Sequence, residues 1–188
     1  MVISNVSFPK VLEEEISSGE KSSKLMVPYL IKSAKQLEKA GADFIVLPCN
    51  TLHALLPDLR DNIGLEILDL IEEVSKKVRQ KGFGKIGILS TTGTRNERLY
   101  DKNLRDVELV YPTKGEQKEV SEIILRIIRK DNAPEDKKYL EDLILRLINK
   151  GAEKVILACT DLANLVDKNG NVLDSTEILI ESVREKMN

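Results

Sequence analysis

Apolar runs alternate with amphipathic stretches along the 188 residues, and this pattern predicts alternating strands and helices. The run from Phe44 to Leu47 is continuously apolar, which is typical of a strand buried on both faces of a parallel sheet. Between Lys24 and Ala40 the apolar positions recur at helical spacing, and Gly41 then ends the helix. Both patterns recur up to the C-terminus.

The remaining elements follow from the same two signals. Apolar runs predict further strands at Val2–Phe8, Leu65–Leu68, Lys85–Ser90, Glu108–Tyr111, Lys154–Ala158 and Val172–Leu173. Amphipathic stretches predict helices at Val11–Ser17, after Thr51 to about Leu59, after Leu68 to about Gln80, at Asn96–Leu104, Gln117–Arg129 and Glu135–Lys150, and from Asp161 and Thr176. Polar residues predict a loop at Ser18–Ser23. This alternation predicts an α/β fold of mainly parallel sheets with helices on both faces.

Two of the predicted strands end in the same way. Gly41-Ala42 precedes the first and Gly151-Ala152 the second, and a cysteine follows each glycine by eight residues. Cys49 and Cys159 are the only two cysteines in the chain. We therefore expect two similar three-layer α/β domains, related by a pseudo-twofold axis, with a site in the cleft between them.

The repeat is incomplete at its start. The predicted strand and loop from Lys85 to Thr94 begin 74 residues before Cys159, whereas only 48 residues precede Cys49. The first half therefore lacks a counterpart of this strand and loop. Either the chain is naturally short there or its start is truncated.

Composition and charge limit the classes of function. The chain is 41% hydrophobic and 32% charged with a net charge of −2, which predicts a globular protein without a dedicated nucleic-acid surface. No apolar run approaches the roughly 20 residues that span a bilayer, and no signal peptide is predicted. Two cysteines without a secretory signal indicate a reducing compartment, so we expect a cytoplasmic protein. The sole histidine, His53, excludes a site of clustered histidines, and no metal is expected.

The paired cysteines are the strongest candidates for chemistry. A single cysteine at a strand end is most often a core residue. Two at equivalent places, at the carboxyl ends of parallel strands and before helix N-termini, favour a functional site. The threonines near them fit either helix capping or ligand binding. His53 fits either a surface or satisfied histidine, or one that tunes Cys49 or faces a ligand. Two thiols across a cleft suit removal of a proton from one face of a carbon and delivery to the other, as a racemase requires.

Four motifs, in order along nearly the whole chain, resemble those of the aspartate/glutamate racemase superfamily. They are Pro48–His53, Ile88–Thr94 with Tyr100 after it, Ala158–Leu162 and Asp174–Ile178. The Pro-Cys-Asn-Thr-x-His form of the first motif resembles the aspartate racemase branch more than glutamate racemase.

The resemblance implies a proton transfer at Cα of an acidic amino acid, most of all aspartate, without pyridoxal phosphate, another cofactor or a metal. It implies that Cys49 and Cys159 are the acid–base pair. The implied substrate-binding residues are Asn50, Thr51, Thr91, Thr94, Thr160, Asp161, Arg129 and Lys10, with His53 as an auxiliary residue. It also implies a homodimer without nucleic-acid or membrane partners. The implied first domain comprises residues 1–70 and 172–188, and the second comprises residues 71–171.

The chain departs from the family pattern in three places. The family's opening strand and its Gly-Gly-Met-Gly-Pro loop have no counterpart. Lys10 stands where aspartate racemases carry an arginine that grips the side-chain carboxylate, and lysine is a point charge rather than a bidentate fork. Asp161 stands where glutamate is usual. Arg129 best matches a further expected basic residue, and Lys130 is its neighbour.

Three alternatives stay open. The chain could be another racemase or isomerase of the superfamily, acting on glutamate, a hydantoin or maleate. It could be a protein that holds an acidic ligand without turnover. It could also be a redox protein whose two thiols form a disulfide.

Overall fold

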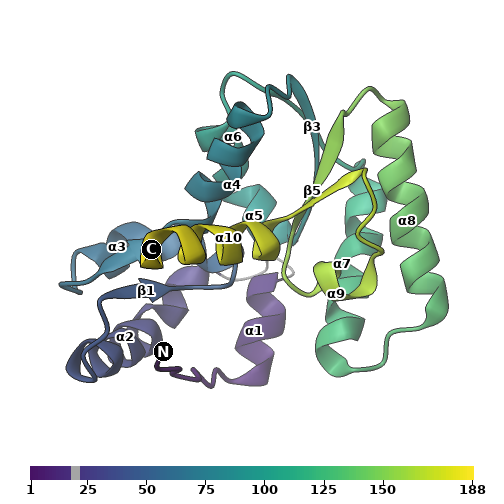
Figure 1. The fold of residues 1–188 in the computed structure, drawn as a ribbon. Coiled ribbons are helices and arrows are strands. Elements are labelled where there is room, and N and C mark those ends of the chain that lie inside the picture. Colours follow the sequence, from purple (N-terminus) through teal and green to yellow (C-terminus); the bar gives the residue numbers. More distant parts are fainter. Residues whose placement is uncertain (18–21) are drawn as a thin grey trace.

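The computed structural model describes residues 1–17 and 22–188, except for the side chains of Lys10, Glu13 and Ser17. Most of the predicted loop at Ser18–Ser23 lies outside this part of the chain. The fold is mixed α/β with parallel strands, as the sequence predicted. Figure 1 shows the strands enclosed by helices.

The strands form two parallel sheets. A two-stranded sheet pairs β1 (Phe44–Val46) with β2 (Glu66–Leu68). The other sheet has the order β4-β3-β5-β6. Its strands are β3 (Lys85–Ser90), β4 (Glu108–Val110), β5 (Lys154–Ala158) and β6 (Val172–Asp174). Each of these strands overlaps a predicted one.

Helices follow the strands in the expected alternation. The α-helices are α1 (Lys10–Ser17), α2 (Val27–Lys39), α3 (Leu56–Arg60), α4 (Leu70–Gln80), α5 (Thr92–Asn96), α6 (Leu99–Asn103), α7 (Lys114–Arg129), α8 (Pro134–Asn149), α9 (Leu162–Leu165) and α10 (Ser175–Met187). Two 3₁₀ segments, η1 (Ser23–Met26) and η2 (Thr51–Leu55), precede α2 and α3. Gly41 has φ +80°, which explains why a glycine ends α2.

The four-stranded sheet is the middle of three layers. Ile86 and Ile88 of β3 face a buried cluster with α4, α6 and α10, whereas Leu89 faces another with α7 and α8. Side chains alternate between faces along a strand, so both faces of β3 are apolar and buried. This explains the continuous apolar run that predicted the strand. A third buried cluster surrounds the two-stranded sheet.

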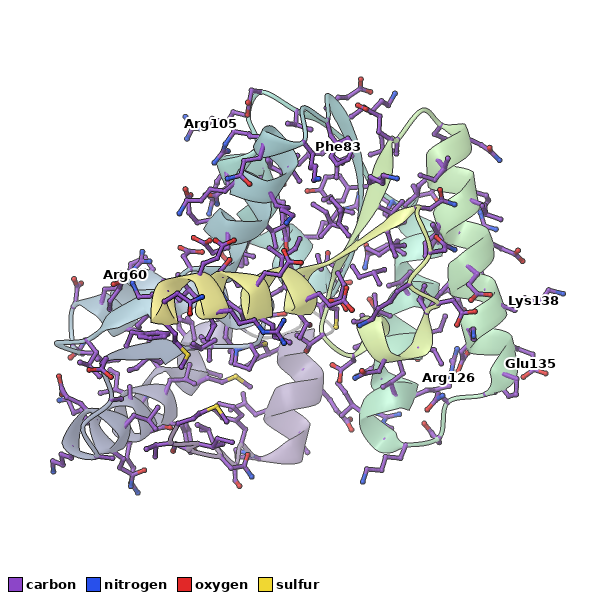
Figure 2. All side chains as sticks on the ribbon, viewed as in Figure 1. Arg60, Phe83, Arg105, Arg126, Glu135 and Lys138 are labelled. Carbon is purple, nitrogen blue, oxygen red and sulfur yellow. The ribbon has the colours of Figure 1, made fainter. Side chains whose placement is uncertain are left out.

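The end of α7 is tied to the start of α8 by Arg126, which is labelled in Figure 2. Its Nη2 and Nε donate to the Asp136 carboxylate at 2.6 and 3.1 Å. Asp136 also accepts from the Ala133 N–H at 2.9 Å, so this carboxylate both pairs with Arg126 and caps α8.

The C-terminal segment joins the two sheets. Strand β6 pairs with β5, which places residues 172–174 in the four-stranded sheet. Helix α10 then packs against α4, and its Lys186 donates to Glu66 of β2 at 2.8 Å (Figure 1). The expected division into residues 1–70 with 172–188 and residues 71–171 stays a prediction. Because β6 pairs with β5, residues 172–174 lie in the same sheet as the strands of residues 71–171.

Two element predictions were wrong. Residues 1–9 form no strand, because a strand needs a neighbouring ladder and β1 pairs only with β2 in the described chain. The segment runs over α2 instead, where the Ser33 hydroxyl donates to Ser4 at 2.7 Å. The predicted helix Asn96–Leu104 is divided into α5 and α6 by Arg98, whose φ of 52° is left-handed.

Candidate active site

The two cysteines follow the ends of two strands in different sheets. Cys49 lies three residues beyond the end of β1, and Cys159 immediately follows β5. Both line one cavity of about 80 Å³. Cys159 is 5% exposed, Cys49 is partly exposed, and neither is in a disulfide. The fold therefore brings to one place two thiols that are 110 residues apart in sequence.

Cys159 is held in its protonated form. Burial raises the pKa of its thiol far above the ordinary range, and the neighbouring Asp161 carboxylate raises it further. The thiol donates to Asp161 Oδ2 at 3.7 Å, and burial also raises the pKa of Asp161. Backbone N–H groups of Asp161 and Leu162 directed at the sulfur oppose the rise in the Cys159 pKa. The site can therefore stabilise a thiolate here, while favouring the thiol at rest.

Asn50 connects the two cysteine turns through buried hydrogen bonds. Its Oδ1 accepts from the Tyr100 hydroxyl at 2.7 Å, and its Nδ2 donates to Ser175 Oγ at 3.1 Å. Ser175 in turn donates to the Leu157 carbonyl, two residues before Cys159, at 2.8 Å. Asn50 was predicted to bind substrate. It does line the cavity, but its side chain holds the end of β1 against the end of β5.

Three threonine hydroxyls form a closed triangle beside the cavity. Thr51 Oγ1 lies 2.8 Å from Thr91 Oγ1 and 3.0 Å from Thr94 Oγ1, and Thr91 donates to Thr94 at 3.0 Å. Thr91 also caps α5 by accepting the Thr94 N–H. Thr51 and Thr91 line the cavity together with Thr160, whereas Thr94 supports them from behind. Thr91 therefore fits both readings, as a helix cap and as a cavity residue, whereas Thr51 and Thr160 fit the second alone.

Both ring nitrogens of His53 form hydrogen bonds with backbone groups. Its Nδ1 lies 2.8 Å from the Cys49 carbonyl, and its Nε2 accepts from the Leu70 N–H at 2.9 Å. This pair of contacts assigns the proton to Nδ1, and burial lowers the pKa of the ring. The residue is 5% exposed and both ring nitrogens have partners, so of the alternatives left open it is the satisfied histidine and not the surface one. It anchors the Cys49 turn to the start of α4.

The two basic residues that were predicted to bind substrate have different outcomes. Arg129 donates through Nε and Nη2 to the Glu14 carboxylate of α1 at 3.1 and 2.7 Å, and its neighbour Ile128 lines the cavity instead. Lys10 begins α1, but its side chain lies outside the described part of the structure. The sequence could not show that Arg129 faces Glu14, because these residues are 115 positions apart.

Apolar residues that the sequence analysis missed complete the cavity. They are Phe8, Ile16, Met26, Leu52 and Ile128. Leu52 lies at the unspecified position of the Pro48–His53 motif, and the other four belong to no recognisable motif. Only the fold identifies these four, because it brings the N-terminal segment, α1, η1 and the end of α7 to the same cavity.

In residues 1–17 and 22–188, no group of three or more His, Cys, Asp or Glu side chains is placed to hold a metal ion. Within the same described ranges, no helix is both long and apolar enough to cross a bilayer.

Comparison with known proteins places the chain in a family. A family model described as Asp/Glu/hydantoin racemase matches residues 1–183. The chain belongs to this family. The broad-specificity amino-acid racemase of Bacillus subtilis is 28% identical over 160 residues, which cover 84% of this chain and 70% of that protein. The motif resemblance in the sequence is thus confirmed at the level of the superfamily.

Solved structures of racemases share the fold. An aspartate racemase homologue from Pyrococcus horikoshii matches with a TM-score of 0.73 at 27% identity, over 92% of this chain and 79% of that one. The aspartate racemase of Picrophilus torridus matches with a TM-score of 0.75 at 24% identity, over 90% of this chain and 74% of that one, and this likeness concerns the fold alone. Membership of the family supports racemase activity in general.

Proposed function

We propose that this chain is an amino-acid racemase in which Cys49 and Cys159 are the two acid–base groups. The observation that carries the proposal is that both thiols line one cavity, at the carboxyl ends of strands from two different sheets. Ligand sites in α/β folds lie at these ends. The family supports the reaction class.

In the proposed reaction, one sulfur removes the Cα proton and the other delivers a proton to the opposite face. The C–H electron pair stays on Cα as a carbanion and then takes the proton of the second thiol. Cys159 starts as the protonated partner, because burial and Asp161 raise its pKa. Cys49 is then the thiolate for the first direction, and the roles reverse for the other enantiomer. The reaction is proposed to need no pyridoxal phosphate and no metal.

The carbanion requires stabilisation, since a Cα proton is far less acidic than a thiol. Hydrogen-bond donors held in place around a site from which water is excluded supply this stabilisation. Thr160, Thr51 and Thr91 line the cavity, and the Asp161 and Leu162 N–H groups lie beside Cys159. We assign to these groups the binding of the substrate α-carboxylate and the support of the thiolate.

The motif at Pro48–His53 favours aspartate as the substrate, and two similar proteins bear on this choice. One relative is a broad-specificity amino-acid racemase, and one structural neighbour is an aspartate racemase homologue. We also propose that the chain forms a homodimer and is located in the cytoplasm.

The proposal is tested by circular dichroism of separate L- and D-amino acids incubated with the purified chain. Decay of the signal from both enantiomers toward zero is expected. The matched controls are Cys49→Ala and Cys159→Ala, and each is expected to slow racemisation at least about a hundredfold. Signals that stay constant across a panel of amino acids would contradict the proposal.

A further inference from the structure

Ser175 is a buried residue that bonds toward both cysteine turns, and we infer that it is a positioning residue that sets the place of one sulfur relative to the other. The inference rests on the proposed racemase function, in which Cys49 and Cys159 must both reach the same Cα. Ser175 is not part of the described cavity lining, so it acts through its neighbours and not by touching the substrate.

The hydroxyl of Ser175 makes one hydrogen bond toward each cysteine. It accepts from Nδ2 of Asn50, the residue after Cys49, at 3.1 Å. It donates to the carbonyl of Leu157, two residues before Cys159, at 2.8 Å. A single Oγ atom therefore joins the segment that follows β1 to the end of β5, and so connects the two sheets beside the thiols.

The two halves of the chain are built alike around this position. In the first half β1 pairs in parallel with β2, and Asp69 then caps α4. In the second half β5 pairs in parallel with β6, and Asp174 then caps α10. The residue after each capping aspartate is 0% exposed, but it is Leu70 in the first half and Ser175 in the second. An apolar side chain thus fills the position in one half, whereas a hydroxyl fills it in the other.

The burial of this hydroxyl is explained by its two bonds. A buried hydroxyl is costly unless it finds hydrogen-bond partners, and Ser175 uses its oxygen as an acceptor and its proton as a donor. Packing of α10 against α4 does not need the hydroxyl, because Ile178 and Leu179 supply the apolar contacts there. The hydroxyl therefore serves the connection between the two cysteine turns.

This connection bears directly on proton transfer between two sulfurs. Cys49 lies three residues beyond the end of β1, so the strand ladder does not fix its place relative to Cys159. A displacement of about 1 Å between reacting groups can slow a reaction by about a hundredfold. Loss of the Ser175 bonds should therefore slow the chemical step more than it weakens substrate binding.

The first test compares Ser175→Ala with Ser75→Ala. Ser175→Ala is expected to lower kcat for L-aspartate racemisation at least about tenfold, with KM changed less than about threefold. Ser75 is the matched control, because it is also 0% exposed but donates within its own helix, to the Ile71 carbonyl at 2.7 Å. Ser75→Ala should keep kcat. An unchanged kcat in folded Ser175→Ala, or an equal loss in the two variants, would overturn the inference.

A double variant tests whether Ser175 acts through Asn50. The Tyr100 hydroxyl donates to the same Asn50 side chain at 2.7 Å. If both residues hold Asn50, Tyr100→Phe combined with Ser175→Ala should lower kcat little more than the more damaging single change. Effects on kcat that multiply would overturn the proposed route through Asn50.

A spectroscopic measurement separates failure of the inference from failure of the proposed function. The chain has only two cysteines, so labelling with [3-¹³C]cysteine gives one NMR signal for each. Ser175→Ala is expected to shift both signals, and Ser75→Ala to leave both in place. Unshifted signals in folded Ser175→Ala would overturn the inference, whether or not the protein is active. Shifted signals in a protein that racemises no amino acid would overturn the proposed function and keep the positioning of the thiols.

Discussion

At the scale of single residues, burial raises the pKa of Cys159 most, and the neighbouring Asp161 raises it further. The carboxylate lies 3.7 Å from the sulfur and raises the thiol pKa. Asp161→Asn removes this negative charge, so the pKa of Cys159 should fall. The pH dependence of Cys159 alkylation, measured in a Cys49→Ala background, should shift to lower pH. A midpoint that is unchanged or higher would contradict the assigned role.

The Tyr100 hydroxyl provides a second test at this scale. Tyr100 is 1% exposed, and its hydroxyl donates to the buried Asn50. Tyr100→Phe leaves that acceptor without its donor, so the free energy of unfolding in urea should fall by about 1–3 kcal/mol. Tyr111→Phe is the matched control, because its partner Asp101 is 27% exposed and can bind water instead. An equal decrease in the free energy of unfolding of the two variants would contradict the stabilising role of the hydrogen bond between Tyr100 and Asn50.

The sequence identified the site residues that stand at strand ends. Cys49, Cys159 and Thr91 were predicted correctly as neighbours, because the ends of buried strands are visible as breaks in apolar runs. The ion pair of Arg129 with Glu14 was not predicted, because a contact between α7 and α1 leaves no local signal in the sequence. The two hydrogen bonds between His53 and the backbone could not be predicted either, because one of them depends on where α4 begins.

At the scale of elements, the packing of α8 on β3 depends on Gly87. A Cβ at this position would lie 2.9 Å from Val155 Cγ2 and 3.3 Å from Leu147 Cβ. Gly87→Ala should therefore lower the free energy of unfolding by about 1–3 kcal/mol. Gly115→Ala is the control, because nothing lies within 4 Å of its Cβ in the first turn of α7. The shifts in melting temperature of the two variants should differ in direction or clearly in size. Similar shifts would contradict the close packing around Gly87.

Elements with local signals were predicted well, and those that depend on distant partners were not. Strands β3 and β5 are buried on both faces, so the residues between their polar ends are apolar or glycine. The apolar residues between Val2 and Phe8 resembled a strand equally well. Val2 and Ile3 are instead exposed, Val6 packs on the cluster around the two-stranded sheet, and Phe8 lines the cavity with its ring 5.7 Å from that of Tyr29 on α2. Whether an apolar segment pairs as a strand is decided by its neighbours in space.

At the scale of the whole molecule, the single histidine links stability to pH. Burial lowers the pKa of His53 in the folded protein below its ordinary value of 6.5. Unfolding therefore takes up a proton as the pH falls below 6.5, so the folded state should lose stability in that window and regain it above. His53→Gln should make the urea-unfolding free energy less dependent on pH between about 7 and 5. An equal pH dependence in both proteins would contradict a neutral, buried His53.

The arrangement of the two sheets makes the central claim testable. The ends of β1 and β5 place Cys49 and Cys159 on one cavity, and two-base proton transfer needs both thiols. The pseudo-twofold that the repeat predicted would present the two faces of a substrate alike.

The most direct measurement follows isotope and configuration together, starting from a single enantiomer in D2O. The substrate is L-aspartate, with other L-amino acids in parallel. A two-base reaction predicts that the first D-product carries deuterium at Cα, while the remaining L-substrate keeps its proton. Cys49→Ala and Cys159→Ala should each form almost no product. Product that retains the original proton, or racemisation at the wild-type rate in either variant, would contradict the assignment of the two cysteines.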